Sequence, residues 1–318
     1  MTPPQPEVTL QRIRAAQERI AGSVLRTPVL ENALLDAACG ARLHFKCENL
    51  QQMGAFKTRG ASNAVFVRSP AELRYGVVTH SSGNHGAAVA RAAQLRGVPA
   101  RIVMPENSSA AKLAAVRAYG GEVTLCAPSI AAREAAAARI VAETGALFIH
   151  PYDDPDVIAG QGTIALELLE QVPQLDWLLC PVGGGGLVSG MAVAAKSLRP
   201  DIRVVAVEPA GADDAYRSFE SGVLVPPAPA ATIADGLRGA LSARTFALMR
   251  AHVDAVVTVD EQAIVRAMRE LWQTLRIVVE PSSAVPYAAV LERKLDLRDG
   301  HVGIVLTGGN VDLDALPW

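Results

Sequence analysis

The chain has 318 residues, of which 50% are hydrophobic, and its 30 lysines and arginines nearly balance its 32 aspartates and glutamates. Such a chain can bury a large core, and its small net charge argues against a nucleic acid as a partner. The cysteines show no C-x-x-C spacing, which argues against a disulfide framework or a zinc site. The N-terminus lacks the apolar stretch of a signal peptide, and the longest uncharged run, 178–195, is broken by proline and glycines. We therefore expect a cytoplasmic protein that does not span a membrane.

From residue 76 onward, short β-branched runs alternate with longer alanine-rich stretches, which is typical of β-α units on a parallel sheet. The first series predicts strands and helices in turn at 77–80, 84–95, 101–104, 110–118, 122–126 and 130–142. The second series follows residues 150–156 and predicts a helix at 158–171, a strand at 177–180, a helix after Gly186, and strands at 204–208 and 302–306. The sequence therefore predicts an α/β fold with two lobes, each an open, mainly parallel sheet flanked by helices.

A lysine in apolar surroundings is the first candidate for chemistry. Lys57 follows the apolar segment MGAF, residues 53–56, and precedes a helix that we expect to begin near Thr58. Apolar surroundings disfavour the charged form of a lysine, so its amine can act as a nucleophile and form an imine. Because most lysines are solvated surface residues, this motif alone does not exclude that Lys57 is an ordinary surface lysine.

A polar cluster, SSGNHG at residues 81–86, follows one predicted strand and precedes a helix. Ligands of parallel-sheet proteins bind at the carboxyl ends of strands, where the free N–H groups of a helix start also lie. The cluster therefore suits an anionic or hydroxylated ligand. The alternative is an ordinary helix cap, since Ser and Asn are preferred there.

A glycine run occupies the same kind of position after the predicted strand 177–180, and consists of Gly183, Gly184, Gly185 and Gly186. Glycines let several backbone N–H groups point at one phosphate, with the helix dipole behind them. A purely structural turn is a poorer interpretation, because four adjacent glycines cost backbone entropy.

The phosphate could belong to a nicotinamide dinucleotide, which would make the protein an NAD-dependent oxidoreductase. Glu208 follows the next strand at about the distance expected of a ribose-binding acid. The G-x-G-x-x-G fingerprint fails, however, because Val188 and Ser189 stand where its last glycine is required. The dinucleotide therefore remains the competing hypothesis.

The segment GAFKTRGA around Lys57, the SSGNHG cluster and the glycine run resemble, in this order and spacing, fold-type II pyridoxal-phosphate (PLP) enzymes of the serine/threonine dehydratase and serine racemase family. The resemblance includes TIADG at 232–236, EPSS at 280–283 and TGGN at 307–310, and so covers nearly the whole chain. It implies a tryptophan synthase beta-like fold. The large PLP-binding domain would comprise residues 1–72 and 153–318, with a small domain of residues 73–152 inserted within it.

The resemblance also implies how each motif binds the cofactor. Lys57, preceded by Phe56, would hold PLP as an imine, Asn84 would bond its 3-hydroxyl, and the glycine run would hold its phosphate. Thr307 would stand at the pyridine nitrogen, where many relatives carry serine. A neutral hydroxyl does not keep that nitrogen protonated, which favours elimination of a β-substituent over a long-lived carbanion.

The expected substrate is a small amino acid with a β-hydroxyl, bound by Ser81, Ser82, His85 and Arg133. The leading hypothesis is an ammonia-lyase that converts L-threonine or L-serine to a 2-oxo acid, with Lys57 taking the α-proton. Serine racemase and threo-3-hydroxyaspartate dehydratase are alternatives within the family. Ser82 favours racemisation, because racemases of the family protonate the opposite face from a serine there. Gly239 argues against it, because racemase relatives present a serine at that point.

The segment EPAGADD, residues 208–214, resembles the family's divalent-cation loop, with the Glu208 and Asp214 carboxylates and the Ala212 carbonyl as ligands. These hard oxygen donors suit magnesium, manganese or calcium. The alternative is a helix start with acidic residues near its N-terminus, where such charges are favoured. The family habit further implies a homodimer.

Overall fold

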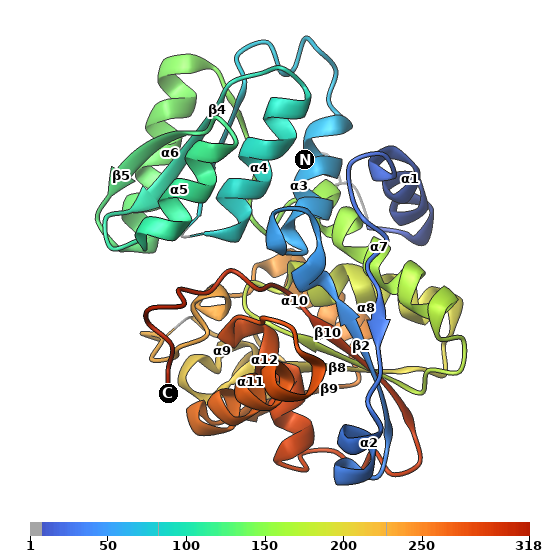
Figure 1. The fold of residues 1–318 in the computed structure, drawn as a ribbon. Helices are drawn as coiled ribbons and strands as arrows, with labels where there is room; N and C mark the ends of the chain where they lie inside the picture. The colour runs from blue at the N-terminus through green and yellow to red at the C-terminus, as the bar shows by residue number, and fades with distance from the viewer. Residues whose placement is uncertain (1–7, 82, 227) are drawn as a thin grey trace. The chain divides into compact units, whose positions relative to one another are not determined.

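The structure, a computed structural model, describes residues 8–81, 83–226 and 228–318, and Ser82 lies outside them. The chain divides into two compact units (Figure 1). Unit 1 comprises Met1–Val24 and Lys57–Thr163, and unit 2 comprises Leu25–Phe56 and Ile164–Trp318. Each unit is built around its own sheet, and each is described by itself below.

Unit 1 contains a parallel four-stranded sheet in the order β5-β4-β3-β6. Its strands are β3 (Val77–His80), β4 (Ala100–Pro105), β5 (Glu122–Cys126) and β6 (Leu147–Phe148). Its helices are α1 (Leu10–Ile20), α3 (Lys57–Phe66), α4 (Asn84–Leu95), α5 (Ala110–Ala118), α6 (Ile130–Thr144) and the first part of α7 (Pro155–Gln171). In Figure 1, α4 and α5 cover one face of this sheet and α6 covers the other. Serine side chains cap α5 and α6, which fixes where these helices begin.

Unit 2 contains a six-stranded sheet in the order β1-β2-β10-β7-β8-β9, in which every pairing except β1 with β2 is parallel. Its strands are β1 (Val29–Leu30), β2 (Arg42–Cys47), β7 (Trp177–Pro181), β8 (Arg203–Pro209), β9 (Ala255–Val259) and β10 (His301–Leu306). Its helices are α2 (Ala33–Cys39), α8 (Gly186–Leu198), α9 (Asp214–Ser221), α10 (Ala243–His252), α11 (Glu261–Leu275), α12 (Pro281–Leu291) and the rest of α7.

The core of unit 2 lies between its sheet and helices α11 and α12. Alternate strand residues such as Leu179, Val205 and Val207 pack there against buried residues of these helices, including Met268 and Tyr287. Helix α12 is buried along almost its whole length, and α11 packs against it (Figure 1). The neighbouring strand residues point to the opposite face, which α8 covers, as the alternation of a pleated strand requires. Both faces of the sheet are therefore covered, as expected for parallel strands.

The predicted α/β fold class, with mainly parallel sheets flanked by helices, is confirmed. The predicted strand at 77–80 and the helices at 84–95 and 110–118 match the observed bounds, and α7 begins three residues earlier than predicted, at Pro155. The unit boundaries near 24, 56 and 163 do not coincide with the domain boundaries expected near 72 and 152. The difference arises because α1, α3 and the start of α7 group with the four-stranded sheet. That domain division stays a prediction. Among the described residues, no helix is long and apolar enough to cross a membrane.

Candidate active site

The predicted site residues are distributed over both units. Unit 1 carries Lys57, Ser81, Asn84, His85 and Arg133, whereas unit 2 carries Phe56, the glycine run, the candidate cation loop and Thr307. Several of these residues follow the carboxyl ends of strands, where parallel sheets bind ligands. Ser82, the predicted second acid-base residue, lies outside the described residues.

In unit 1, Lys57 is the first residue of α3 and is half-buried. Its Nζ donates a hydrogen bond of 2.9 Å to the carbonyl oxygen of Pro151, which follows β6. His85 lies close enough to Lys57 for the two charges to interact. Burial lowers the pKa of His85 well below its usual value, and the positive charge of Lys57 adds to this effect. The lysine therefore has a neutral hydrogen-bond acceptor and an uncharged imidazole beside it.

His80, His85 and His150 lie near one another at the carboxyl ends of β3 and β6. The rings of His80 and His150 lie 5.9 Å apart, and His150 packs edge-on against Tyr152 at 4.7 Å. Burial, with the charges of His150 and Arg133, lowers the pKa of His80 to about 4. The Nδ1 atom of His150 accepts hydrogen bonds from the backbone N–H groups of Tyr152 and Asp153. Sequence reasoning gave His80 and His150 no role.

The polar cluster after β3 begins α4. Ser81 is buried, and its Oγ accepts a hydrogen bond from the Gly83 N–H at 3.1 Å. Asn84 is the first residue of the helix and is half-buried. Arg133 lies on α6, and its charge reaches His80. Unit 1 therefore brings Arg133 and the histidines to the strand ends that also carry Ser81 and Asn84, which supports the substrate-binding prediction without testing it.

In unit 2, the glycine run connects β7 to α8. Gly185 has a φ of 81°, which favours glycine, and a Cβ there would lie 2.9 Å from that of Thr245. A Cβ on Gly183 would lie 2.8 Å from the Cα atom of Leu237. Both positions therefore require glycine, and the free N–H groups of α8 begin directly after them. Packing explains the glycines at these two positions, and N–H groups at the start of a helix are suited to a phosphate.

The three further motifs of the family resemblance lie together in unit 2. The Gly236 N–H of TIADG donates to Ser282 Oγ of EPSS at 3.1 Å. EPSS in turn bonds TGGN, because the Glu280 N–H donates to the Gly308 carbonyl at 2.9 Å. Thr307, which precedes Gly308 at the end of β10, is 3% exposed. These motifs therefore form one hydrogen-bonded group that also reaches the glycine run through Leu237.

The candidate cation loop brings buried carboxyl groups close together. Glu208 is fully buried, and its carboxylate accepts hydrogen bonds from the N–H groups of Ala215 and Tyr216 at the start of α9. Burial, with the negative charges of Asp214 and Asp213, raises the pKa of Glu208 to about 8. Among the described residues, buried Asp214 Oδ2 has no hydrogen-bond partner. A divalent cation would favour the ionised form of both carboxyl groups and could bind this Asp214 oxygen, so the residues fit one.

No group of three or more His, Cys, Asp or Glu side chains in the described parts of the chain could hold a metal ion. The predicted site uses two carboxylates and the Ala212 carbonyl, and so stays a prediction. The engagement of Glu208 by α9 also removes the basis for treating it as a ribose-binding acid.

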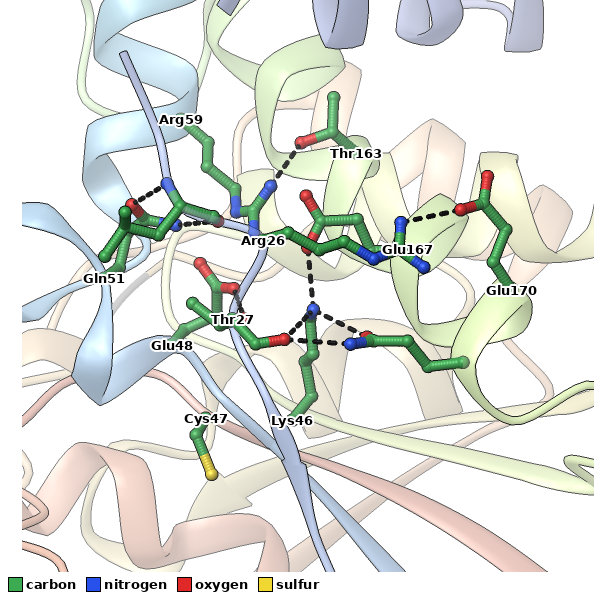
Figure 2. Close-up of polar contacts among 12 residues, drawn as sticks. Arg26, Thr27, Lys46, Cys47, Glu48, Gln51, Arg59, Thr163, Glu167 and Glu170 are labelled. Carbon is green, nitrogen blue, oxygen red and sulfur yellow. Dashed lines mark hydrogen bonds and ion pairs between the residues drawn. The ribbon is translucent and has the colours of Figure 1, made fainter. Parts of the chain in front are cut away.

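A second lysine, Lys46, is fully buried in unit 2 (Figure 2). Its Nζ donates to Glu167 Oε2 at 2.7 Å, to the Thr27 carbonyl at 2.9 Å and to Gln171 Oε1 at 2.9 Å. Thr27 also donates from its hydroxyl to the buried carboxylate of Glu48 at 2.6 Å. Three oxygen acceptors, one of them a carboxylate, favour the charged ammonium. Lys46 is therefore a structural cation.

Two parallel sheets with a lysine, a polar helix start and a glycine loop at strand ends define a fold-type II PLP-dependent enzyme. A family model described as "Pyridoxal-phosphate dependent enzyme" matches residues 20–308, and the chain belongs to this family. The nicotinamide alternative therefore loses its support, and the glycine run fits the phosphate of PLP instead.

Named relatives within the family differ in the reaction that they catalyse. A β-hydroxyaspartate dehydratase from Paracoccus denitrificans is 49% identical and covers 98% of both chains. The structure of maize serine racemase matches with a TM-score of 0.95 and 48% identity, and covers 96% of this chain and 95% of that one. The structure of a threonine deaminase from T.th. matches with a TM-score of 0.90 and 45% identity, with 96% and 99% covered. The comparisons therefore leave racemase and dehydratase equally supported.

Proposed function

We propose that the protein is a PLP-dependent ammonia-lyase that removes water and ammonia from a small β-hydroxy amino acid, with L-threonine and L-serine as its first candidate substrates. The observation that supports this proposal is the environment of Lys57, whose amine donates to the neutral Pro151 carbonyl beside the uncharged ring of His85. Once deprotonated, the amine can act as a nucleophile on the cofactor and, when released, accept a proton, as elimination requires.

When bound, PLP would withdraw electrons from the substrate and so acidify its α-carbon. In the proposed reaction, Lys57 removes the α-proton, and the freed electron pair forms a double bond to the β-carbon. The β-hydroxyl departs with a proton as water. The resulting enamine hydrolyses to a 2-oxo acid and ammonia.

Other residues of the chain would bind and orient the reactants. The N–H groups of the glycine run would hold the cofactor phosphate, Asn84 its 3-hydroxyl, and Thr307 its ring nitrogen without adding charge. Ser81, His85 and Arg133 would bind the substrate, with the guanidinium of Arg133 suited to a carboxylate.

Two other reactions have specific support. The 49% identical relative favours 3-hydroxyaspartate as a substrate, and the match to maize serine racemase favours racemisation. Racemisation would need a second acid-base group, for which Ser82 is the candidate in the sequence. Gly239 supplies no side-chain hydroxyl where racemases of the family present one. We therefore place elimination first.

The test is a substrate panel on the purified protein. L-threonine, L-serine and L-threo-3-hydroxyaspartate are each added while 2-oxo acid and D-serine are assayed. We expect a visible imine band that borohydride removes, with the reduced cofactor on Lys57, and 2-oxo acid as the main product. D-serine without 2-oxo acid would overturn the lyase. A colourless protein that cannot be reconstituted with PLP would overturn the cofactor assignment.

We also propose that the loop of Glu208, Ala212 and Asp214 binds magnesium, manganese or calcium, and that the protein is a homodimer. The buried carboxyl groups of the loop, with one Asp214 oxygen that has no hydrogen-bond partner among the described residues, support the first proposal, and the second rests on family habit. Adding each cation to chelator-treated protein should raise its melting temperature. Replacing Asp214 by asparagine should weaken that response. Light scattering on the same samples reports the oligomeric state.

A further inference from the structure

The segment that leads to Lys57 contains a backbone turn that is unfavourable for one of its residues. Met53 has φ and ψ angles of 56° and 16°, and Gly54 follows with a φ of 73°. Glycine adopts this left-handed conformation freely, whereas a methionine does so at a steric cost. Neighbouring contacts must therefore hold Met53 in place.

Those contacts come from the TGGN segment, in the same unit. Residues 53–56 pair with residues 307–310, running in opposite directions. The contacts are Asn310 Nδ2 to the Met53 carbonyl at 2.9 Å, the Gly309 N–H to the Gly54 carbonyl at 2.9 Å, an antiparallel bridge between Ala55 and Gly308, and the Phe56 N–H to the Thr307 carbonyl at 3.0 Å. Lys57 is the next residue, so this row of contacts ends where the lysine begins.

Of the four contacts just described, the one to the Met53 carbonyl is made by a side chain, that of Asn310. The other contacts join backbone atoms, which any residue supplies. Asn310 also lies directly against the turn, because a Cβ on Gly54 would come within 2.7 Å of its Oδ1. We propose that Asn310 is a positioning residue for Lys57. Its amide holds Met53 in the left-handed conformation, and so fixes the Phe56 backbone to which Lys57 is joined.

This proposal rests on the proposed role of Lys57 as the residue that binds PLP. Without the Asn310 amide, the segment before the lysine would sample other conformations, and fewer of them would present the amine correctly. Small displacements of a reacting group reduce the rate without a matching change in substrate affinity. The effect should therefore appear in kcat and in imine formation rather than in KM.

The experiment compares the wild type with Asn310→Ala. Hydrogen exchange at the Gly54 and Phe56 amides is measured in the protein without cofactor, and imine formation on Lys57 is followed after PLP is added. We expect exchange at these two amides to rise about tenfold. We also expect imine formation and kcat to fall by about tenfold, with KM changed by less than about threefold.

The matched control is Asn49→Ala. Asn49 lies in the segment leading to Lys57, is 7% exposed, and its Nδ2 likewise donates to a backbone carbonyl, that of Val278, at 3.0 Å. It does not contact the left-handed turn through that bond. We expect this variant to lose a comparable amount of stability while exchange at residues 53–56 and imine formation stay near wild type. Equal behaviour of the two variants in these readouts would overturn the proposal.

Two further variants test the cause. In the Asn310→Ala background, Met53→Gly should restore most of the lost imine formation, because glycine adopts the left-handed conformation without help. No recovery would contradict the proposal. If Asn310→Ala does not fold, Asn310→Asp keeps the shape but cannot donate when ionised, and wild-type exchange in that variant would also contradict it. Absence of an imine on wild-type Lys57 would overturn the proposed function, whereas the exchange measurement would still test the turn.

Discussion

Lys46 and Lys57 lie only eleven positions apart in the chain, yet their surroundings differ in kind. Lys46 is fully buried, and its ammonium donates to a carboxylate, an amide and a carbonyl. Lys57 is only half-buried, and it donates to a carbonyl beside an uncharged histidine. The carboxylate of Glu167 stabilises the charged form of Lys46. We therefore expect Lys46 to contribute to stability and Lys57, the more exposed of the two, to contribute to catalysis.

The largest expected effect is the loss of catalysis on Lys57→Ala. Activity should fall by about 10³-fold or more, because the variant lacks both the imine-forming amine and the base. Its urea midpoint should stay close to that of the wild type, since Lys57 is not fully buried. The assay is 2-oxo acid release from L-threonine, and Lys57→Arg serves as the charge-preserving control. Undiminished activity of either variant would contradict the catalytic role proposed for Lys57.

The second expected effect is a loss of stability on Lys46→Met. The substitution removes one partner of the buried ion pair between Lys46 and Glu167, whose side chain is 7% exposed. Such a change costs about 3–5 kcal/mol. Urea denaturation measures it, and the folded fraction should keep its imine on Lys57.

The double variant Lys46→Met/Glu167→Leu is the control for this interpretation. Because both buried charges are then removed, it should be clearly more stable than Lys46→Met alone. A double variant as unstable as the single one would show that the lysine stem, not its charge, stabilises this part of unit 2.

The two lysines also show what the sequence can and cannot predict. The β-α rhythm after residue 76 predicted three strands of each sheet, whereas β1, β2, β6 and β9 were not predicted. Strand β2 was not predicted, because charged residues and a histidine make up half of RLHFKC, which is unusual in a buried strand. Its buried His44 and Lys46 are satisfied by His301 and by residues of α7, which are distant in sequence. Such a strand is recognisable only once its partners are known.

Some residues of the candidate site are likewise indicated by sequence motifs, whereas others are recognised only in the fold. Local motifs identified Lys57, Asn84 and the glycine run, since each motif lies within a few adjacent residues. The carbonyl of Pro151, 94 positions after Lys57, belongs to no motif, and only the tertiary fold brings it to Lys57. His80 ends the strand predicted at 77–80, but nothing in the sequence shows that its ring lies close to His150. Met53 is similar, because nothing in its side chain indicates a left-handed conformation.

The third prediction concerns pH, which should affect the surroundings of Lys57. The pKa of His80 is about 4 in the folded protein, against a usual value near 6.5. Because the unfolded chain binds the proton more tightly, stability present above pH 6.5 is lost as the pH falls toward 4. The full difference is about 3 kcal/mol. His80→Phe should remove this part of the dependence. Equal slopes of unfolding free energy against pH in the two proteins would contradict the prediction.

The smallest expected effect concerns the exposed ion pair between Arg26 and Glu170. Glu170 lies on α7, which also carries Glu167, the partner of Lys46. Arg26 and Glu170 lie 2.7 Å apart, with side chains 50% and 57% exposed (Figure 2). Solvent screens such a pair, so Arg26→Ala should cost about 0.5 kcal/mol or less, and high salt should reduce even that. Urea denaturation at two salt concentrations measures it beside Lys46→Met. If Arg26→Ala costs as much stability as Lys46→Met, solvent exposure does not determine how much each of the two ion pairs on α7 contributes. A negligible loss would attribute the stabilisation to the buried position of the Lys46–Glu167 pair, since the two pairs have the same separation of 2.7 Å.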